Sequence, residues 1–496
     1  MNNNTFANAL NTENAKTKTW NGADALNTTG SKCLDFFGLI GSCRNVHPLK
    51  KCTLFDEAYN ESPDDAMKLL FYARDIRGGY GERDAFNQIF AHLAETHSDS
   101  VIKNIPNVME FGRAKDLYTL IGTPAETAMW EYIKMQFNED VENMKNHKPI
   151  SLLAKWLATP NASSKKTSKL GVLTAHKIGY TKNQMAEYRK TLSALRTYIK
   201  VVEKDMSANE WKNIDYSIVP SNCMLKNKNA FIRHDKDRYN EFINNVNSGK
   251  TTMHMNTVTP VDIMSKVLKG DNSVEINTMW KSLPQVDTNA LVVCDTSGSM
   301  CGSYYKNVVS PITVAVALSI YFAQHNVDGF KNKFFTFSNT PHLVSIKGDT
   351  LLQQYNSIIN SDWGMSTNLE AVFDKILKIG IQYNIADKDM PKSILVISDM
   401  QINPYVCRQF KKGDITFTNS LKQKFASQGY TLPTIIYWNV NAQNPTFHAT
   451  ATSNGVMFVS GYSTNIMKQV MENIGKTPMD LMNTILTSNR YKNITA

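Results

Sequence analysis

Residues 291–299 read Leu-Val-Val-Cys-Asp-Thr-Ser-Gly-Ser, a short apolar run that ends in a carboxylate followed by hydroxyl side chains. A run of this kind and length predicts a buried β-strand. A second apolar run, Ser393–Ser398, also ends in a carboxylate, Asp399. In sheets built from buried parallel strands, ligands bind at the carboxyl ends of the strands. The residues just past these two runs are therefore the first candidates for a functional site.

The segment from residue 285 to residue 496 alternates predicted strands with predicted helices. Further strands are expected at 333–337, 433–438 and 456–459, and helices near 307–325, 350–360, 368–379 and 417–428, with two more helices at the end. Such alternation is typical of a parallel sheet that helices cover on both faces. We therefore predict an α/β doubly wound domain over residues 285–496.

The preceding segment, residues 31–284, has helical periodicity and no alternating strands. One helix begins at Ser62-Pro63-Asp64-Asp65, a capping box with proline in the first turn, and ends at the glycines near Gly79. Further helical stretches lie near 126–137, 148–157, 183–205 and 236–246. Short loops between such helices predict a helical bundle or a HEAT-like solenoid. Residues 1–30 are rich in Asn and Thr and predict an extended or flexible arm.

The composition restricts the class of protein. A chain of 496 residues exceeds what one hydrophobic core serves, and 42% hydrophobic with only 20% charged residues argues against a largely disordered chain. No apolar run reaches the roughly 18 residues that a membrane span requires, and the start does not resemble a signal peptide. The seven cysteines are scattered and odd in number, which argues against a disulfide framework. We expect a soluble, cytoplasmic protein.

The net charge of +10 is concentrated in one part of the chain. Residues 1–150 carry −4, residues 151–250 carry +10 and residues 251–496 carry +4. Within 151–200, ten basic residues accompany a single acid, Glu187. A basic excess confined in this way indicates a local anionic partner.

Eight side chains of this basic segment are candidate phosphate ligands. They are Lys155, Lys165, Lys166, Lys169, Arg189, Lys190, Arg196 and Lys200. Lysines bind phosphate as point charges, and the hydroxyls between them are short donors. The spacing of Arg189, Arg196 and Lys200 predicts that the three share one helix face. A solvated helix face would explain the same charges, but such faces usually mix both signs, and here acids are nearly absent.

A second set of residues suits a divalent cation. Asp295, Ser297, Ser299, Thr367 and Asp399 offer hard oxygen ligands, which favour octahedral Mg²⁺ or Mn²⁺. The chain lacks a GxxxxGK[ST] loop, so no nucleotide cofactor is expected, and it lacks the paired His or Cys ligands of a zinc site. No nucleophile with an adjacent base stands beside this set, so we expect no catalysis, and a nuclease or other hydrolase is the weakest hypothesis.

The order of these elements resembles the von Willebrand factor A domain with its metal-ion-dependent adhesion site. The DxSxS core matches at Asp295, Ser297 and Ser299, the later hydroxyl at Thr367 and the last acid at Asp399. The resemblance implies a metal site that binds a ligand and does not cut it.

The helical segment resembles the TROVE module of Ro-type ribonucleoproteins, and most closely that module's uncharacterised relatives in fungi, plants, bacteria and large viruses. The matching stretches are residues 70–83 (Leu-Phe-Tyr-Ala-Arg-Asp-Ile-Arg-Gly-Gly-Tyr-Gly-Glu-Arg), 110–117 (Glu-Phe-Gly-Arg-Ala-Lys-Asp-Leu), 154–168 and 188–190. In Ro-type proteins this module is a ring of HEAT-like repeats that the von Willebrand A domain closes, and it binds small structured RNA.

Two functional hypotheses follow from the residues and the resemblance together. The first is an RNA-binding, ribonucleoprotein-type scaffold whose basic segment holds phosphates. The second is a protein-interaction adaptor, in which the metal captures a carboxylate of a protein partner and the basic segment binds an acidic protein.

Overall fold

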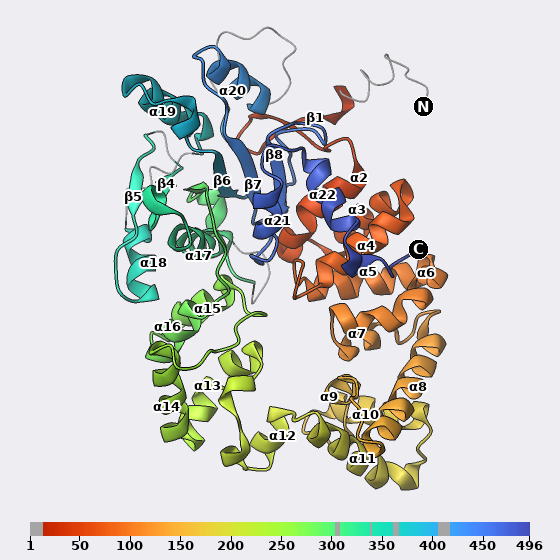
Figure 1. Ribbon diagram of the computed structural model, residues 1–496. Coiled ribbons are helices and arrows are strands. Elements are labelled where there is room, and N and C mark those ends of the chain that lie inside the picture. The colour runs from red at the N-terminus through yellow and green to blue at the C-terminus, as the bar shows by residue number, and fades with distance from the viewer. Residues whose placement is uncertain (1–12, 303–307, 338–339, 361–366, 405–416) are drawn as a thin grey trace.

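The computed structural model describes residues 13–302, 308–337, 340–360, 367–404 and 417–496. A long helical part comes first, and a mixed six-stranded sheet with its own helices follows. Figure 1 shows the helical part as an arc that leaves the sheet on one side and returns to it on the other. The predicted order, helices first and an α/β part second, is confirmed.

The helical arc comprises α2 to α16. Their bounds are α2 Lys32–Leu39, α3 Pro48–Glu61, α4 Pro63–Arg74, α5 Arg83–Thr96, α6 Ser98–Asn104, α7 Val108–Phe111, α8 Glu126–Lys145, α9 Leu153–Trp156, α10 Lys165–Ile178, α11 Met185–Tyr198, α12 Val202–Ser207, α13 Ser221–His234, α14 Lys236–Asn247, α15 Pro260–Val267 and α16 Val274–Lys281. Consecutive helices such as α2 and α3 or α13 and α14 pack against each other. The apolar stripe of each helix is thereby buried against its neighbour.

The sheet follows the order β5-β4-β3-β6-β7-β8, which is the doubly wound arrangement. Its strands are β3 Leu291–Cys294, β4 Lys333–Thr336, β5 Leu343–Ser345, β6 Ser393–Ser398, β7 Thr434–Asn439 and β8 Val456–Ser460. Every residue of β3, β6, β7 and β8 is buried, so both faces of the central sheet are covered. The five predicted strands pair in parallel as expected, and the structure adds one short edge strand that was not predicted, β5, which pairs antiparallel with β4.

The helices of this part are α17 Pro311–Gln324, α18 Leu351–Ile359, α19 Leu369–Gln382, α20 Phe417–Ala426, α21 Met467–Glu472 and α22 Pro478–Leu486. Helix α17 packs on β3, β4 and β6 and is buried along nearly its whole length. Among the described residues, no helix combines the length and the apolar character that a bilayer span requires.

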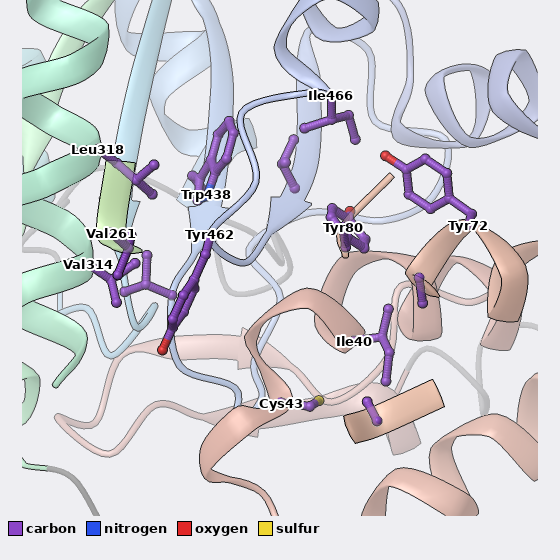
Figure 2. Packing of buried hydrophobic residues seen from close by; sticks show 14 of the residues in the cluster. Ile40, Cys43, Tyr72, Tyr80, Val261, Val314, Leu318, Trp438, Tyr462 and Ile466 are labelled. Atoms are coloured by element: carbon purple, nitrogen blue, oxygen red, sulfur yellow. The ribbon is translucent and has the colours of Figure 1, made fainter. Parts of the chain in front are cut away.

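Both ends of the helical arc lie on the sheet part. Helix α2 packs against β8 and α22, and α15 packs against α17. Figure 2 shows side chains of both parts in one continuous core: Tyr80 and Ile40 come from the arc, and Ile466, Trp438 and Leu318 come from the sheet part. The arc and the sheet therefore form a closed circuit with a shared hydrophobic core.

Residues 13–30 are more ordered than the expected arm. They form a hairpin of β1 (Lys16–Lys18) and β2 (Asp24–Leu26), and residues 1–12 lie outside the described residues. Leu26 exchanges two backbone hydrogen bonds with Phe447, with N–O distances of 2.8 and 2.9 Å. The hairpin was missed because it owes its order to this pairing with a segment that lies far away in the sequence.

Candidate metal centre and nucleic-acid interface

The two carboxylates predicted from the sequence meet at the centre of the sheet. Strands β3 and β6 are neighbours, with Cys294 paired to Ile397, and the order of the sheet reverses between them. Asp295 follows β3 and Asp399 follows β6, and both are buried. Ligands of doubly wound sheets bind at this switch point.

Local hydrogen bonds fix the orientation of the Asp295 carboxylate. The backbone N–H of Ser297 donates to its Oδ1 at 2.9 Å, and the hydroxyl of Ser398 donates to its Oδ2. The backbone N–H of Asp295 itself donates to the carbonyl of Ile397 at 3.0 Å. Asp295 is therefore held from both strands, with its carboxylate at their ends.

Of the three predicted hydroxyls, those of Ser297 and Ser299 contact the two acids, and Thr367 lies on a third loop, where its carbonyl accepts from the Asn403 N–H at 3.0 Å. Ser297 Oγ and Ser299 Oγ are 3.0 Å apart, and Ser297 is buried whereas Ser299 is exposed. Thr367 precedes α19, is buried, and donates from its Oγ1 to Asn403 Oδ1 at 2.6 Å. Residues 361–366, which include the neighbouring hydroxyl of Ser366, lie outside the described residues.

The electrostatics of this site suit a cation. Burial, and then the nearby charge of Asp295, raise the pKa of Asp399 to about 7, although the Gln401 N–H and the Ser299 hydroxyl lower it. Burial also raises the pKa of Asp295, against the opposing hydrogen bonds from Ser398 and Ser297. Within the described residues, no Lys, Arg or His forms an ion pair with either carboxylate. Two buried acids that form no ion pair with a described residue, together with three hydroxyls, fit the ligand set of a hard divalent cation.

The structure adds a contributor that the sequence did not indicate. The turn of the β1–β2 hairpin reaches this site, where the Asn21 side-chain amide donates to Thr367 Oγ1 at 2.9 Å. The backbone N–H of Trp20 donates to Gln401 Oε1 at 2.7 Å. Asn21 and Thr367 are separated by most of the chain, so no local spacing could have revealed this contact.

The second candidate site is the basic segment on α9 to α11. Lys165, Lys166 and Lys169 lie in the first turns of α10, are exposed, and form no ion pair with any described residue. The first turn of α10 contains no acid, and Ser164 caps it by accepting from the Thr167 N–H. The structure therefore gathers these three cations at one helix N-terminus.

The loop before α10 is held by side chains of the neighbouring helices. The guanidinium of Arg196 donates to the carbonyls of Ala154 and Leu157 at 2.9 and 2.8 Å and to Thr159 Oγ1 at 3.0 Å. Tyr188 is fully buried and donates to the Ala158 carbonyl at 3.0 Å. Arg196 thus positions the loop with all three nitrogens of its guanidinium, which differs from the predicted role as a phosphate ligand.

The predicted common face of Arg189, Arg196 and Lys200 does not form. Lys200 lies beyond the end of α11 with a backbone φ of +51°, and Arg196 turns into the loop. Arg189 is half-buried, and its Nε is buried without a hydrogen-bond partner among the described residues. The three residues have helical spacing in the sequence, but α11 ends at Tyr198, so Lys200 is not on the helix.

Two further lysines lie near the cluster. Lys190 is exposed on α11. Lys155 on α9 lies 5.6 Å from the ring centroid of Trp156, and the guanidinium of Arg113 lies 5.1 Å from the same centroid. Trp156 is half-buried, and both of these cations lie close to its ring.

Comparison with known proteins identifies the family of the helical part. The model of a domain of unknown function, DUF2828, matches residues 19–150 and 134–293, which together span more than half of the chain. The chain belongs to this family. The model of another domain of unknown function, DUF7788, matches residues 289–490.

The DUF2828 chain is also similar to two individual proteins. It is 28% identical over 512 residues to the uncharacterized protein L728 of Acanthamoeba polyphaga mimivirus, covering 94% of this chain and 86% of the viral protein. Among solved structures, the crystal structure of the Ro (RSR) protein of Deinococcus radiodurans matches with a TM-score of 0.38 and 11% identity. That match covers 90% of this chain and 93% of the Ro chain.

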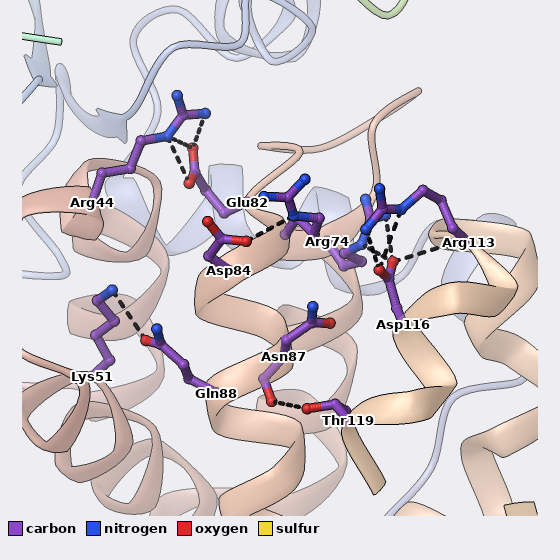
Figure 3. A network of polar contacts seen from close by, with 11 residues as sticks. Arg44, Lys51, Arg74, Glu82, Asp84, Asn87, Gln88, Arg113, Asp116 and Thr119 are labelled. Carbon is purple, nitrogen blue, oxygen red and sulfur yellow. Dashed lines mark hydrogen bonds and ion pairs between the residues drawn. The ribbon is translucent and has the colours of Figure 1, made fainter. Parts of the chain in front are cut away.

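The glycine-rich motif of the DUF2828 part, residues 74–84, carries buried charged side chains that bind distant segments of the chain. Figure 3 shows the Asp116 carboxylate between Arg74 and Arg113, which donate to it at distances down to 2.6 Å. Asp116 and Arg74 are both buried. Within the motif itself, Arg83 pairs with its neighbour Asp84 at 2.7 Å.

Two acids of the same motif link the DUF2828 part to the sheet part. Asp75 is fully buried and accepts from the guanidinium of Arg490 and from the Tyr491 hydroxyl, the latter at 2.9 Å. Glu82 is buried beside Arg44, whose guanidinium lies 3.8 Å from the ring centroid of Tyr462. These partners come from distant segments, so the spacing of the motif could not have named them.

Proposed function

We propose that this protein is an RNA-binding scaffold, and that the α10 lysine cluster, Lys165, Lys166 and Lys169, holds RNA phosphates. The observation that carries this proposal is the cluster itself: three exposed cations at a helix N-terminus that form no ion pair with a described acid. Lysines at this end of a helix are opposed by the helix dipole, which favours anions there. A bound phosphate would relieve that repulsion and would accept hydrogen bonds from the free N–H groups.

The surroundings of the cluster favour a polyanion over a single small anion. Within 151–200 the ten basic residues face a single acid, and only Lys177 forms an ion pair with a described residue, Glu126. Lys155 and Lys190 place further positive charge on α9 and α11, two helices that pack together and that Arg196 joins by its hydrogen bond to the Ala154 carbonyl. A phosphate backbone is a chain of charges that such a region can follow.

RNA affinity should fall steeply with salt. If about six phosphates are neutralised, the logarithm of the association constant should fall with the logarithm of salt concentration at a slope of about −4 to −5. Fluorescence anisotropy of a short labelled RNA hairpin at several salt concentrations measures this slope. Absence of binding at low salt, or a slope near zero, would contradict the proposal.

We further propose that Mg²⁺ or Mn²⁺ binds at Asp295, Ser297, Ser299, Thr367 and Asp399, in a role that is not catalytic. The support is the buried pair of carboxylates with raised pKa values and the hydroxyls around it. When bound, the ion would supply positive charge that offsets the two acids and attracts an anionic ligand. Ser299, as the exposed member of the set, marks the side from which that ligand would approach.

Mg²⁺ should raise the melting temperature of the purified protein, and EDTA should reverse the effect. A ligand at a hundred times its dissociation constant stabilises the native state by about 2.7 kcal/mol. Asp295→Ala should abolish the response, because it removes one of the two charged ligands. Asp349→Ala, which changes an exposed acid elsewhere in the sheet part, should respond like the wild type. Differential scanning fluorimetry measures both, and an unchanged response in Asp295→Ala would rule out this site.

The exposed position of Ser299 also favours a second function, that of a protein-interaction adaptor. In that case the metal would capture a carboxylate of a protein partner, and the α10 lysine cluster would bind an acidic protein. The two functions differ on purification at low salt. RNA that co-purifies and can be cross-linked and sequenced supports the scaffold, whereas a nucleic-acid-free complex that EDTA or Asp295→Ala dissociates supports the adaptor.

A further inference from the structure

The turn of the β1–β2 hairpin contacts two of the three loops that carry the candidate metal ligands, the loop of Thr367 and the loop after Asp399. The Asn21 amide nitrogen donates to Thr367 Oγ1 at 2.9 Å and also to the backbone carbonyl of Gln401. Gln401 in turn donates its backbone N–H to Asp399 Oδ1 at 3.1 Å. Asn21 therefore contacts one predicted ligand, Thr367, directly, and it also contacts the loop that carries a second one, Asp399.

Counting hydrogen bonds shows what Asn21 does to the Thr367 hydroxyl. A threonine hydroxyl has one proton to donate and two lone pairs that accept. The proton is directed to Asn403 Oδ1 at 2.6 Å, and one lone pair accepts from Asn21 at 2.9 Å. These two bonds fix the rotation of the hydroxyl, and its second lone pair has no partner among the described residues.

We propose that Asn21 is a positioning residue of the metal centre, acting through Thr367; this inference rests on the metal site proposed above. With its proton on Asn403 and one lone pair on Asn21, Thr367 presents its remaining lone pair to the ion. Hydrogen-bond partners that orient metal ligands typically contribute 10- to 100-fold to metal affinity. The N-terminal hairpin is then part of the site, and metal binding and hairpin docking strengthen each other by the same factor.

The hairpin has other anchors, so the role of Asn21 can be separated from the attachment of the hairpin. Leu26 exchanges two backbone hydrogen bonds with Phe447, and the Ala451 N–H donates to the Thr29 carbonyl at 2.9 Å. The Thr19 hydroxyl donates to the carbonyl of Ile402 at 2.7 Å. Loss of the Asn21 side chain leaves all of these contacts in place.

Titration calorimetry with Mg²⁺ on the full chain tests the inference. Asn21→Ala should bind Mg²⁺ about 10- to 100-fold more weakly than the wild type. The matched control is Asn27→Ala, which changes an exposed asparagine of the same segment whose amide, among the described residues, donates to the Asn14 carbonyl alone. That control should retain wild-type affinity. As a second readout, Mg²⁺ should slow amide hydrogen exchange over residues 16–26 in the wild type and not in Thr367→Ala.

The outcomes separate this inference from the metal site itself. If Asn21→Ala binds Mg²⁺ as tightly as the wild type while Thr367→Ala binds it weakly, the metal site stands and the positioning role of Asn21 is overturned. Hydrogen exchange over 16–26 that does not respond to Mg²⁺ overturns the coupling. A wild-type chain that binds no Mg²⁺ overturns both proposals.

Discussion

Replacing Lys165, Lys166 and Lys169 together by glutamate should lower RNA affinity about 100-fold or more at low salt. Each lysine–phosphate contact at about 4 Å in water is worth about 1 kcal/mol, so losing three costs about 3 kcal/mol, and every 1.4 kcal/mol is tenfold. The reversed charges add repulsion to this loss. The salt slope should also become shallower by about three, because three fewer counterions are released.

A matched variant separates this local effect from a change in net charge. Lys250→Glu, Lys269→Glu and Lys281→Glu together make the same change in charge at exposed positions elsewhere on the helical arc. This control should keep most of the wild-type RNA affinity in the same anisotropy measurement. If both triple variants lose affinity equally, the RNA does not bind at the α10 lysine cluster and follows the overall charge of the protein.

The second large effect is expected on stability. Asp116→Ala should lower the free energy of unfolding by about 3–5 kcal/mol, because it leaves the buried guanidinium of Arg74 without its counter-charge. Burial raises the pKa of the Asp116 carboxyl, but Arg74 and Arg113 outweigh that effect and hold the pKa below its ordinary value. The carboxylate is therefore charged at neutral pH, and its removal exposes the full cost of a buried, unpaired cation.

Asp84→Ala provides the comparison within the same network (Figure 3). Asp84 pairs with Arg83 at 2.7 Å, but its side chain is 70% exposed, and exposed pairs contribute at most about 1 kcal/mol. Urea unfolding monitored by circular dichroism should therefore shift far more for Asp116→Ala than for Asp84→Ala. Equal shifts would mean that the Arg74–Asp116–Arg113 cluster is not a buried ionic support of the helical arc.

Much of the sheet part could be predicted from the sequence because its signals are local. The apolar runs 291–294 and 393–398 are short, buried on both faces and end in aspartate, and parallel strands place such ends at one edge. The position of Asp295 beside Asp399 followed from that rule. Strand β5 and the β1–β2 hairpin were missed, because three-residue strands carry no periodic pattern that could be recognised.

In the basic segment, the sequence predicted the excess of charge but not the contacts of every side chain. Its excess of charge was readable in the composition, and Lys165, Lys166 and Lys169 are exposed as expected. The helical spacing of Arg196, however, could not show that its guanidinium binds three oxygens of the preceding loop. An arginine on a helix has the same spacing whether it meets solvent or a neighbouring backbone.

The sequence by itself determined the features that depend on periodicity and on composition. These are a helical part, an α/β part, a localised positive charge and a set of oxygen ligands at strand ends. What only the tertiary structure decided depends on pairs of residues far apart in the chain. Asn21 reaches Thr367, and Arg490 reaches Asp75, because the helical arc returns to the sheet and brings the two ends of the chain onto one domain. The sequence shows that each of these side chains is present, but the contacts between them form only when the chain folds into the closed arrangement.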